Sequence, residues 1–293
     1  MNNKYAIVIL THNLYFTEVA LQNMPKQTDI DIIFINDVRY KDCMKGLTDL
    51  IIKYKLQMNA RIFSSTKINS YIRSILKLTK DGNSFLDMYT MGMNINAQYF
   101  ILGHPNSPYE KALFLDEDVL ILRDMIDVFK KEKVANLRSI LNTSFYQAND
   151  DYALAWQEMA GCDYETWKYA YINGGQRIYT WTKTFRDEYR NLLEKFYNTK
   201  VFYESFKRWK TTGKNKSKAF FMDQSFETSF LVRNNLQNDN IKQYVRYLVG
   251  SKCIEDTRKA KYLDRHLLHY AITVDKVKKA SFLRVLKKEG LIK

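Results

Sequence analysis

Proline, glycine, cysteine and histidine are all scarce in this chain of 293 residues. It has only three prolines and ten glycines, and no Gly/Ser-rich stretch separates one part of the sequence from another. The length suits one large domain, and the hydrophobic content of 46% is enough to build its core. We therefore expect a single domain over residues 1–293.

The three cysteines, Cys43, Cys162 and Cys253, lie far apart, and no Cys-X-X-Cys pair occurs. This spacing excludes a zinc knuckle, and an odd number of widely spaced cysteines does not suit a disulfide framework. We expect three free thiols in a reducing compartment.

Long hydrophobic runs are also missing. The first apolar run, Tyr5–Leu10, is too short for a signal peptide, and no run approaches the length of a membrane span. We expect a protein of the cytoplasm without a transmembrane segment.

Acidic residues are in the minority, with 32 Asp and Glu against 46 Lys and Arg, for a net charge of +14. An excess of this size favours an acidic partner, which can be a nucleic acid, an anionic membrane surface or a nucleotide.

Apolar runs and helical periodicity alternate along the first 125 residues. Runs typical of buried strands cover 5–10, 30–35, 60–65 and 111–122. Helical patterns fall between them, at 16–24, 42–56, 68–79 and 84–101. This alternation predicts an α/β fold with a mostly parallel sheet. The rest of the chain is mostly helical in pattern, with one further strand near 169–181.

Polar clusters follow three of the expected strands, at Thr11–Asn13, Asn36–Asp37 and Asp116–Asp118. The carboxyl ends of parallel strands meet at one edge of a sheet, where ligands of such folds bind. We therefore expect these clusters to share a site.

The third cluster lies inside an apolar run, "ALFLDEDVLIL". On an extended strand Asp116 and Asp118 point to the same side, while Glu117 points elsewhere. Two carboxylates on one side suit Mg²⁺ or Mn²⁺, which can offset the charge of a leaving phosphate. The alternative is a strand that simply ends in solvated acids.

This stretch resembles the DxD segment of nucleotide-sugar glycosyltransferases of the GT-A fold, in particular the glycogenin-like and bacterial galactosyltransferase-like enzymes. Further segments resemble the same enzymes in the same order: "AIVILTHN", "IIFINDV", "NSYIRSILKL", "YINGGQRIY", "FMDQSFET" and "RHLLHYA". The resemblance implies a GT-A, Rossmann-like central sheet, with a nucleotide-sugar-binding half at 1–125 and a helical, basic acceptor half at 126–293.

The resemblance also implies a UDP-sugar as donor. The residues expected to contact it are Thr11, Asn13, Asp37, Arg73, Asn173 and Gly174. Each has a simpler alternative. Asp37, Thr11 and Asn13 suit a helix N-cap, Arg73 a solvated helix face, and the Asn-Gly-Gly segment a tight turn.

For the metal, the resemblance implies Mn²⁺ or Mg²⁺ held by Asp116, Asp118 and a late histidine. His269 is our choice for that ligand, with His266 as the alternative. Asp223 and Gln224 are the expected catalytic residues, where a carboxylate can orient a hydroxyl, stabilise the transition state or act as a base. The simpler interpretation of "DQSFETSFL" is a helix N-terminus with a good capping pattern, and this interpretation is compatible with a catalytic role. The resemblance of the Asn-Gly-Gly and Asp-Gln segments to those of the same enzymes implies retention of configuration.

The acceptor half carries basic residues beside aromatic ones. The cluster comprises Lys207, Arg208, Lys210, Lys214 and Lys216. A Lys-rich amphipathic C-terminal helix follows at 274–293. Such segments bind phosphates and stack on bases, or lie on anionic membranes. We predict DNA with hydroxymethylated cytosine as acceptor, as modified by some bacteriophage enzymes. A cell-surface or lipid-linked glycan is the alternative.

Two other classes of protein remain open. A nucleotidyltransferase would also pair acids around Mg²⁺, but no Gly-rich phosphate loop follows the first strand. A non-catalytic nucleic-acid-binding protein would keep the basic clusters but would not need Asp116 and Asp118.

Overall fold

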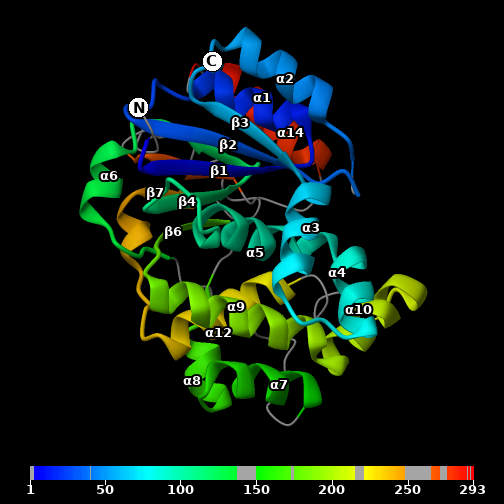
Figure 1. Cartoon of the computed structure of the whole chain (residues 1–293). Helices are drawn as coiled ribbons and strands as arrows, with labels where there is room; N and C mark the ends of the chain where they lie inside the picture. Colours follow the sequence, from blue (N-terminus) through cyan, green and yellow to red (C-terminus); the bar gives the residue numbers. More distant parts are fainter. Residues whose placement is uncertain are drawn as a thin grey trace.

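The structure is a computed structural model, which describes residues 3–39, 41–136, 150–172, 175–214, 221–247, 265–270, 276–288, 290 and 292–293 (Figure 1). The strands are β1 (Tyr5–Thr11), β2 (Ile30–Asn36), β3 (Ala60–Ser64), β4 (Lys111–Asp116), β5 (Val119–Ile121), β6 (Gln176–Thr180), β7 (Val245–Tyr247) and β8 (Leu267–His269). The helices up to residue 131 are α1 (Leu14–Asn23), α2 (Met44–Lys53), α3 (Ser65–Ile75), α4 (Lys80–Met88), η1 (Thr90–Gly92), α5 (Met93–Gln98), η2 (Tyr99–Gly103) and α6 (Ile126–Lys131). The later helices are α7 (Asp151–Ala160), α8 (Tyr164–Tyr169), α9 (Lys183–Asn198), α10 (Lys200–Thr212), α12 (Met222–Arg233), η4 (Asn240–Gln243) and α14 (Lys276–Lys288).

A five-stranded sheet with the order β3-β2-β1-β4-β6 forms the centre of the fold. Its first four strands are parallel, and β6 runs antiparallel to β4 at the edge. All seven residues of β2 are buried, as the continuous apolar run predicts for a strand covered on both faces. A second, smaller sheet has the order β5-β8-β7.

Helices cover both faces of the central sheet (Figure 1). Apolar side chains of α1, α2 and α6 pack on one face, against Ile7, Ile9 and Phe34. The alternate residues Val8, Leu10 and other apolar side chains face α3, α4 and α5, and beyond them the long helices α9 and α12. The α/β fold with a mostly parallel sheet is therefore confirmed.

The acidic run departs from its prediction as one continuous strand. β4 ends at Asp116, a turn occupies residues 117–118, and β5 begins at Val119 in the other sheet. Apolar residues lie on both sides of the turn because each flank is buried in a different sheet. The expected helix over 84–101 is likewise divided, into α4, η1, α5 and η2.

The basic C-terminal segment is part of the folded body. Phe282, Leu283 and Leu286 of α14 are buried against Phe16 and Val19 of α1. Arg284, Lys287 and Lys288 are exposed on the outer side of the same helix. The predicted amphipathic stripe is thus used for packing within this chain.

Within the described ranges, no helix is long and apolar enough to cross a membrane. Cys43 is buried and Cys162 is half-buried, and neither is held in a disulfide. Cys253 lies outside the described residues.

Candidate metal centre

The carboxyl edge of the central sheet brings the three polar clusters of the sequence together. In the register of the sheet, Thr11 lies beside Asn36 and Leu10 lies beside Asp116. The antiparallel strand β6 begins at the same edge, where Gln176 lies beside Leu115. The predicted meeting of these clusters is confirmed.

Asp116, Asp118 and His269 form a compact group at this edge. One ligand atom from each residue lies within 4.8 Å of the others. His269 Nε2 is 3.2 Å from Asp118 Oδ1, and Asp118 and His269 are both buried. His269 reaches this position because β8 pairs with β5, with Val119 opposite His269. Two carboxylates and an imidazole at this spacing suit a divalent ion such as Mn²⁺.

The convergence of the two aspartates comes from a turn. The predicted alternation of side chains along one extended strand is wrong, because the strand ends at Asp116. Glu117 does point elsewhere: its Oε2 accepts hydrogen bonds from the backbone N–H groups of His12 (2.7 Å) and Asn13 (2.6 Å). A carboxylate at the start of α1 is favourable because the helix dipole is positive there.

Thr11 and Asn13 lie next to this turn. Thr11 is fully buried, and Thr17 Oγ1 lies 3.5 Å from its hydroxyl. Asn13 is the N-cap of α1, and its side chain accepts a hydrogen bond from the backbone N–H of Tyr15. The capping interpretation therefore describes Asn13, while a contact with a nucleotide stays a prediction for both residues.

Asp37 is fully buried and paired with Arg39. The guanidinium forms two hydrogen bonds with the carboxylate, Nε to Oδ1 at 2.9 Å and Nη2 to Oδ2 at 3.0 Å. The N-cap of α2 is Cys43, so Asp37 does not cap that helix. A donor contact of Asp37 would have to share the carboxylate with Arg39.

Arg73 lies on the last turn of α3 and is exposed. Its guanidinium contacts Asp87 Oδ1 and donates to Asn83 Oδ1 at 3.0 Å. Arg39 donates to the carbonyl oxygens of Leu86 and Asp87, so Arg73 and Arg39 meet around Asp87. The expected role of Arg73 near a diphosphate stays a prediction.

Asn173 and Gly174 lie outside the described residues. Their neighbour Gly175 is described, and its carbonyl oxygen accepts a hydrogen bond from the backbone N–H of Asp116 (3.0 Å). This hydrogen bond holds Gly175 beside Asp116.

Asp223 and Gln224 lie in the first turn of α12, half-buried. The expected helix N-terminus is present: α12 begins at Met222 with Phe221 as N-cap, so Asp223 lies in the first turn rather than at the cap. Burial raises the pKa of Asp223 to about 6, Arg177 opposes this rise, and the charge of Asp116 adds to it. The charge of Asp116 therefore acts on Asp223, whose role at the site stays a prediction.

His266 occupies a different environment from His269. Its ring packs edge-on against Tyr244 with centroids 5.5 Å apart. Burial, followed by the charge of Arg123, lowers the pKa of His266. Of the two candidate histidines, His269 is the one that lies with Asp116 and Asp118.

A buried ionic network beneath Asp223 was not predicted from the sequence. Arg177 on β6 and Glu227 on α12 are each 1% exposed, with Nη2 and Oε1 3.9 Å apart. Glu227 also accepts hydrogen bonds from Tyr179, Tyr189 and Gln98. Arg177 donates from Nε to Gln98 Oε1 at 3.1 Å. No sequence signal marked this pair, because the burial of α12, which makes a partner for Glu227 necessary, becomes apparent only in the fold.

The predicted acceptor residues lie on and after α10. Lys207, Arg208, Lys210 and Lys214 are exposed, and Lys216 lies outside the described residues. Lys207 Nζ is 5.7 Å from the ring centre of Tyr203, and Lys210 Nζ is 5.3 Å from that of Trp209. This face of α10 combines cations with aromatic rings.

The sequence matches no protein-family model and no curated protein. Among solved structures, the bifunctional glycosyltransferase WbbM, in its apo form, is similar over 98% of this chain with 14% identity and a TM-score of 0.58. This chain covers 50% of that protein. The match shows that the central sheet and its helices have the GT-A type of fold.

Two other structures are similar at lower scores. Mouse xyloside xylosyltransferase 1 matches 91% of this chain and 97% of its own, with 11% identity and a TM-score of 0.49. The galactosyltransferase LgtC, in complex with donor and acceptor sugar analogues, matches 98% and 96%, with 13% identity and a TM-score of 0.48.

Proposed function

We propose that this protein is a metal-dependent glycosyltransferase that moves a sugar from a UDP-sugar to a hydroxyl group of an acceptor. The observation that carries the proposal is the group formed by Asp116, Asp118 and His269 at the carboxyl edge of the sheet. In an α/β sheet this edge is where nucleotide ligands bind. The similarity of fold to WbbM supports the same reaction class.

The donor set fits a divalent ion that coordinates both oxygen and nitrogen. Carboxylates suit Mg²⁺ and Mn²⁺ alike, and the imidazole of His269 favours Mn²⁺. A bound ion would offset the charge that develops on the leaving diphosphate. Asp116 and Asp118 would hold the ion, while Glu117 keeps the turn between them fixed to the start of α1.

Asp223 is the residue we propose to act on the acceptor side. It is half-buried, its charge is coupled to that of Asp116, and Asn94 Nδ2 donates a hydrogen bond to its Oδ2 at 3.3 Å. A raised pKa lets this carboxylate accept or return a proton near neutral pH. Gln224 follows it on the same helical turn and can orient a sugar hydroxyl.

The acceptor we propose is DNA that bears hydroxymethylated cytosine. The net charge of +14 and the cation–aromatic face of α10 support a polyanion whose bases can stack. The modified base would have to leave the duplex stack to reach the donor. The burial of Phe282, Leu283 and Leu286 in the fold argues against a membrane-bound glycan held by the C-terminal helix.

The enzyme class is tested by UDP release in the presence of Mn²⁺ from a panel of UDP-sugars. The double variant Asp116→Asn with Asp118→Asn should lose transfer and keep its fold, as measured by circular dichroism. Asp29→Asn is a matched control, since Asp29 is exposed and its left-handed φ of 55° also suits asparagine. Full activity in the double variant would refute the metal centre.

The acceptor is tested by adding hydroxymethylcytosine-containing DNA to the same assay. Stimulated UDP release would support DNA as acceptor, and slow release without stimulation would keep the enzyme class and redirect the search to glycans. Binding of this DNA should weaken steeply with salt. Lys207→Ala with Lys210→Ala should weaken binding about tenfold and flatten that salt dependence, whereas Lys45→Ala on α2 should not.

A further inference from the structure

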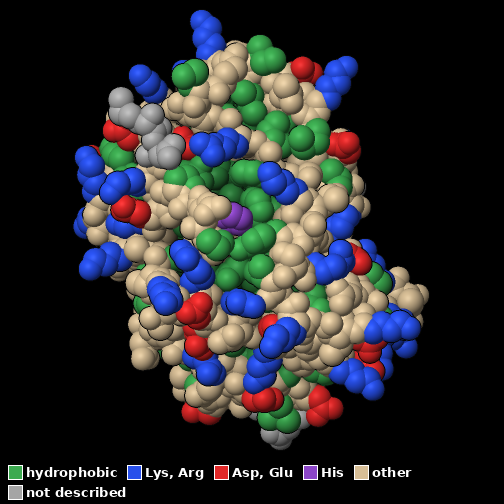
Figure 2. All heavy atoms as spheres, in the orientation of Figure 1, with side chains coloured by type: hydrophobic (Ala, Val, Ile, Leu, Met, Phe, Trp, Pro, Cys, Tyr) green, Lys and Arg blue, Asp and Glu red, His purple; other side chains and the backbone are tan. Residues whose placement is uncertain are grey.

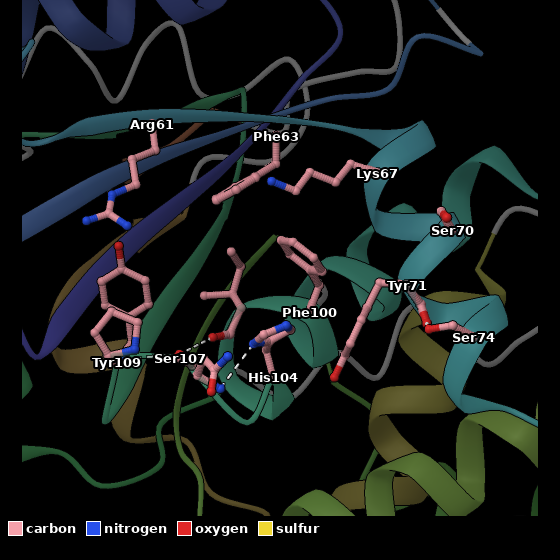
Figure 3. Close-up of a pocket in the computed structure, with 13 residues that line it drawn as sticks. Arg61, Phe63, Lys67, Ser70, Tyr71, Ser74, Phe100, His104, Ser107 and Tyr109 are labelled. Carbon is pink, nitrogen blue, oxygen red and sulfur yellow. Dashed lines mark hydrogen bonds between the residues drawn. The ribbon is translucent and has the colours of Figure 1, made fainter.

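A pocket with a volume of about 500 Å³ lies along the edge strand β3. Its walls come from β3, α3, η2 and the loop that leads to β4 (Figure 3). The face shown in Figure 2 has a hollow near its middle, with hydrophobic side chains inside it and Lys and Arg side chains around it. No residue of the proposed metal centre lines this pocket.

The pocket lies along the β3 edge of the sheet, apart from Asp116 on β4. Phe63, which lines it, pairs with Ile35 of β2, and Ile35 and Asp116 both lie beside Leu10 of β1. Three strand spacings of roughly 4.8 Å, about 14 Å in all, therefore separate the backbone of Phe63 from that of Asp116. Tyr109, which also lines the pocket, precedes β4 and lies about 23 Å from Asp116 at roughly 3.3 Å per residue. None of the residues expected to contact the donor lines the pocket, so a ligand here would lie apart from those contacts.

Aromatic rings form one continuous wall of the pocket. Phe100 lies edge-on to Phe63, with ring centres 5.1 Å apart, and edge-on to Tyr71, at 5.5 Å. Tyr71 also contacts the His104 ring at 4.8 Å. All four rings are half-buried, so each keeps part of its surface open to a ligand. Such a wall can hold a flat ring by stacking.

Cations lie above and beside these rings. Lys67 Nζ is 5.2 Å from the ring centre of Phe63, and Figure 3 shows its chain extending over the pocket. Arg61 lies on the same rim, where Asp31, 3.7 Å away, partly offsets its charge. Arg186 and Arg190 act on Tyr71 from α9 and oppose the rise in its pKa that burial causes. The rim of the pocket thus carries two cations, Arg61 and Lys67, beside its aromatic wall.

The polar groups of the pocket are mostly held in place. His104 Nδ1 accepts a hydrogen bond from the backbone N–H of Asn106 at 3.1 Å, so in the neutral ring Nε2 carries the hydrogen. Ser107 Oγ donates to the carbonyl oxygen of Ile101, and the backbone N–H of Tyr109 donates to Ser107 Oγ. These bonds fix the loop before a ligand arrives, which lowers the entropic cost of binding.

We propose that this pocket binds a nucleotide, with its base against Phe100, Tyr71 and His104 and its phosphate toward Lys67. A planar ring joined to an anion matches the arrangement of aromatic wall and cationic rim, whereas a neutral sugar would leave Lys67 without a charged partner. A free nucleotide and one residue of a nucleic-acid strand share this chemistry. The proposal does not depend on the transferase activity.

Binding is measured by isothermal titration calorimetry with adenosine 5′-monophosphate and, separately, with a short single-stranded oligonucleotide. The titrations contain EDTA and use the protein with Asp116→Asn and Asp118→Asn. Metal-dependent binding at the proposed donor site is thereby removed. We expect saturable binding of at least one probe. If the oligonucleotide binds more tightly, the natural ligand is part of a nucleic-acid strand. If the mononucleotide binds more tightly, the natural ligand is a free nucleotide.

Two variants locate the binding in this pocket. Phe100→Leu keeps an apolar side chain but removes the ring, and should weaken binding about tenfold. Lys67→Ala should weaken it about tenfold and lower the slope of log Kd against log salt by about one. Lys45→Ala removes the same charge from α2, which packs on the opposite face of the sheet, and should have no effect.

The proposal is overturned if neither probe binds, or if binding is unchanged in both Phe100→Leu and Lys67→Ala. Binding of a neutral oligosaccharide in place of both nucleotide probes would also overturn it. UDP release from the unmodified protein is assayed in parallel, so that loss of this proposal is distinguished from loss of the proposed transferase.

Discussion

Glu117 accepts a hydrogen bond of 2.6 Å from the backbone N–H of Asn13, the N-cap of α1. This contact joins the turn that carries the proposed metal ligands to the end of β1. The backbone carbonyl oxygen of Asp118 accepts a hydrogen bond from the N–H of Tyr270 (3.1 Å), so the turn is tied to the end of β8 by its backbone and to the start of α1 by the Glu117 side chain. Glu117 is therefore the side chain that we expect to hold Asp116 and Asp118 in register.

Replacing Glu117 tests this role. Glu117→Ala should destabilise the protein by about 1–3 kcal/mol, because two partly buried N–H groups lose a charged acceptor. Mn²⁺ affinity should fall as well, since the turn loses its anchor. Urea unfolding and calorimetry with Mn²⁺ measure the two effects. Glu165→Ala, an exposed acid in the first turn of α8, is the control and should leave Mn²⁺ affinity unchanged; unaltered affinity in Glu117→Ala would refute the anchoring role.

Substitutions of His266 and His269 should have different effects on the affinity for Mn²⁺. His269→Asn should lower Mn²⁺ affinity at least tenfold, because it removes one of three ligands. His266→Asn should leave it unchanged, because that ring packs against Tyr244. Equal effects of the two substitutions would show that His269 acts only through packing.

Asp223 should make stability depend on pH in the metal-free protein. Its folded-state pKa of about 6 lies above the ordinary value of 3.8, so the folded state binds the proton more tightly. The stabilisation is complete below pH 3.8 and is lost as the pH rises through about 6. Asp223→Asn should therefore raise the free energy of unfolding at pH 7.5 by about 1–3 kcal/mol.

The measurement for Asp223 is urea unfolding in EDTA at pH 5 and at pH 7.5, with Asp29→Asn as the exposed control. The gain in Asp223→Asn should be larger at pH 7.5. A gain of the same size at both pH values would contradict the raised pKa.

The Arg177–Glu227 pair should behave as a buried ion pair. Arg177→Met alone should cost about 3–5 kcal/mol, because it leaves the Glu227 carboxylate buried without its cation. Adding Glu227→Gln should recover part of this loss, since the remaining groups are neutral. Lys195→Ala, which breaks an exposed pair with Glu158, should cost less than about 1 kcal/mol. The free energies of unfolding of Arg177→Met, Glu227→Gln and the double variant are measured by urea unfolding. If the loss in the double variant equals the sum of the two single losses, the two residues are not coupled.

The sequence predicted the central sheet because its strands are buried on both faces. Ile30–Asn36 is apolar at nearly every position, and helical patterns of period 3.6 fall between such runs. The same apolar character hid the break after Asp116, because β4 and β5 are both buried and nothing in composition separates them. The break becomes apparent only because β5 pairs with β8 and not with the strands of the central sheet, and β8 lies far along the chain.

The site was predictable where residue type alone carries chemistry. The carboxylates of Asp116 and Asp118 predict a metal site, the resemblance to glycosyltransferases adds His269, and the fold brings the three residues together. Arg177 was missed because an arginine next to an expected turn and strand usually lies on the surface. Its burial depends on Gln98 and Glu227, two residues from other elements that no local pattern connects to it.

The pairing of β5 with β8 places Asp118 and His269 side by side although about 150 positions separate them. An ion bound between them would act as a crosslink that closes most of the second half of the chain into a loop. During synthesis such a crosslink cannot form until His269 has been added, so the growing protein would be unable to bind its metal until then. Metal binding would then favour the folded chain over any shorter form that ends before His269.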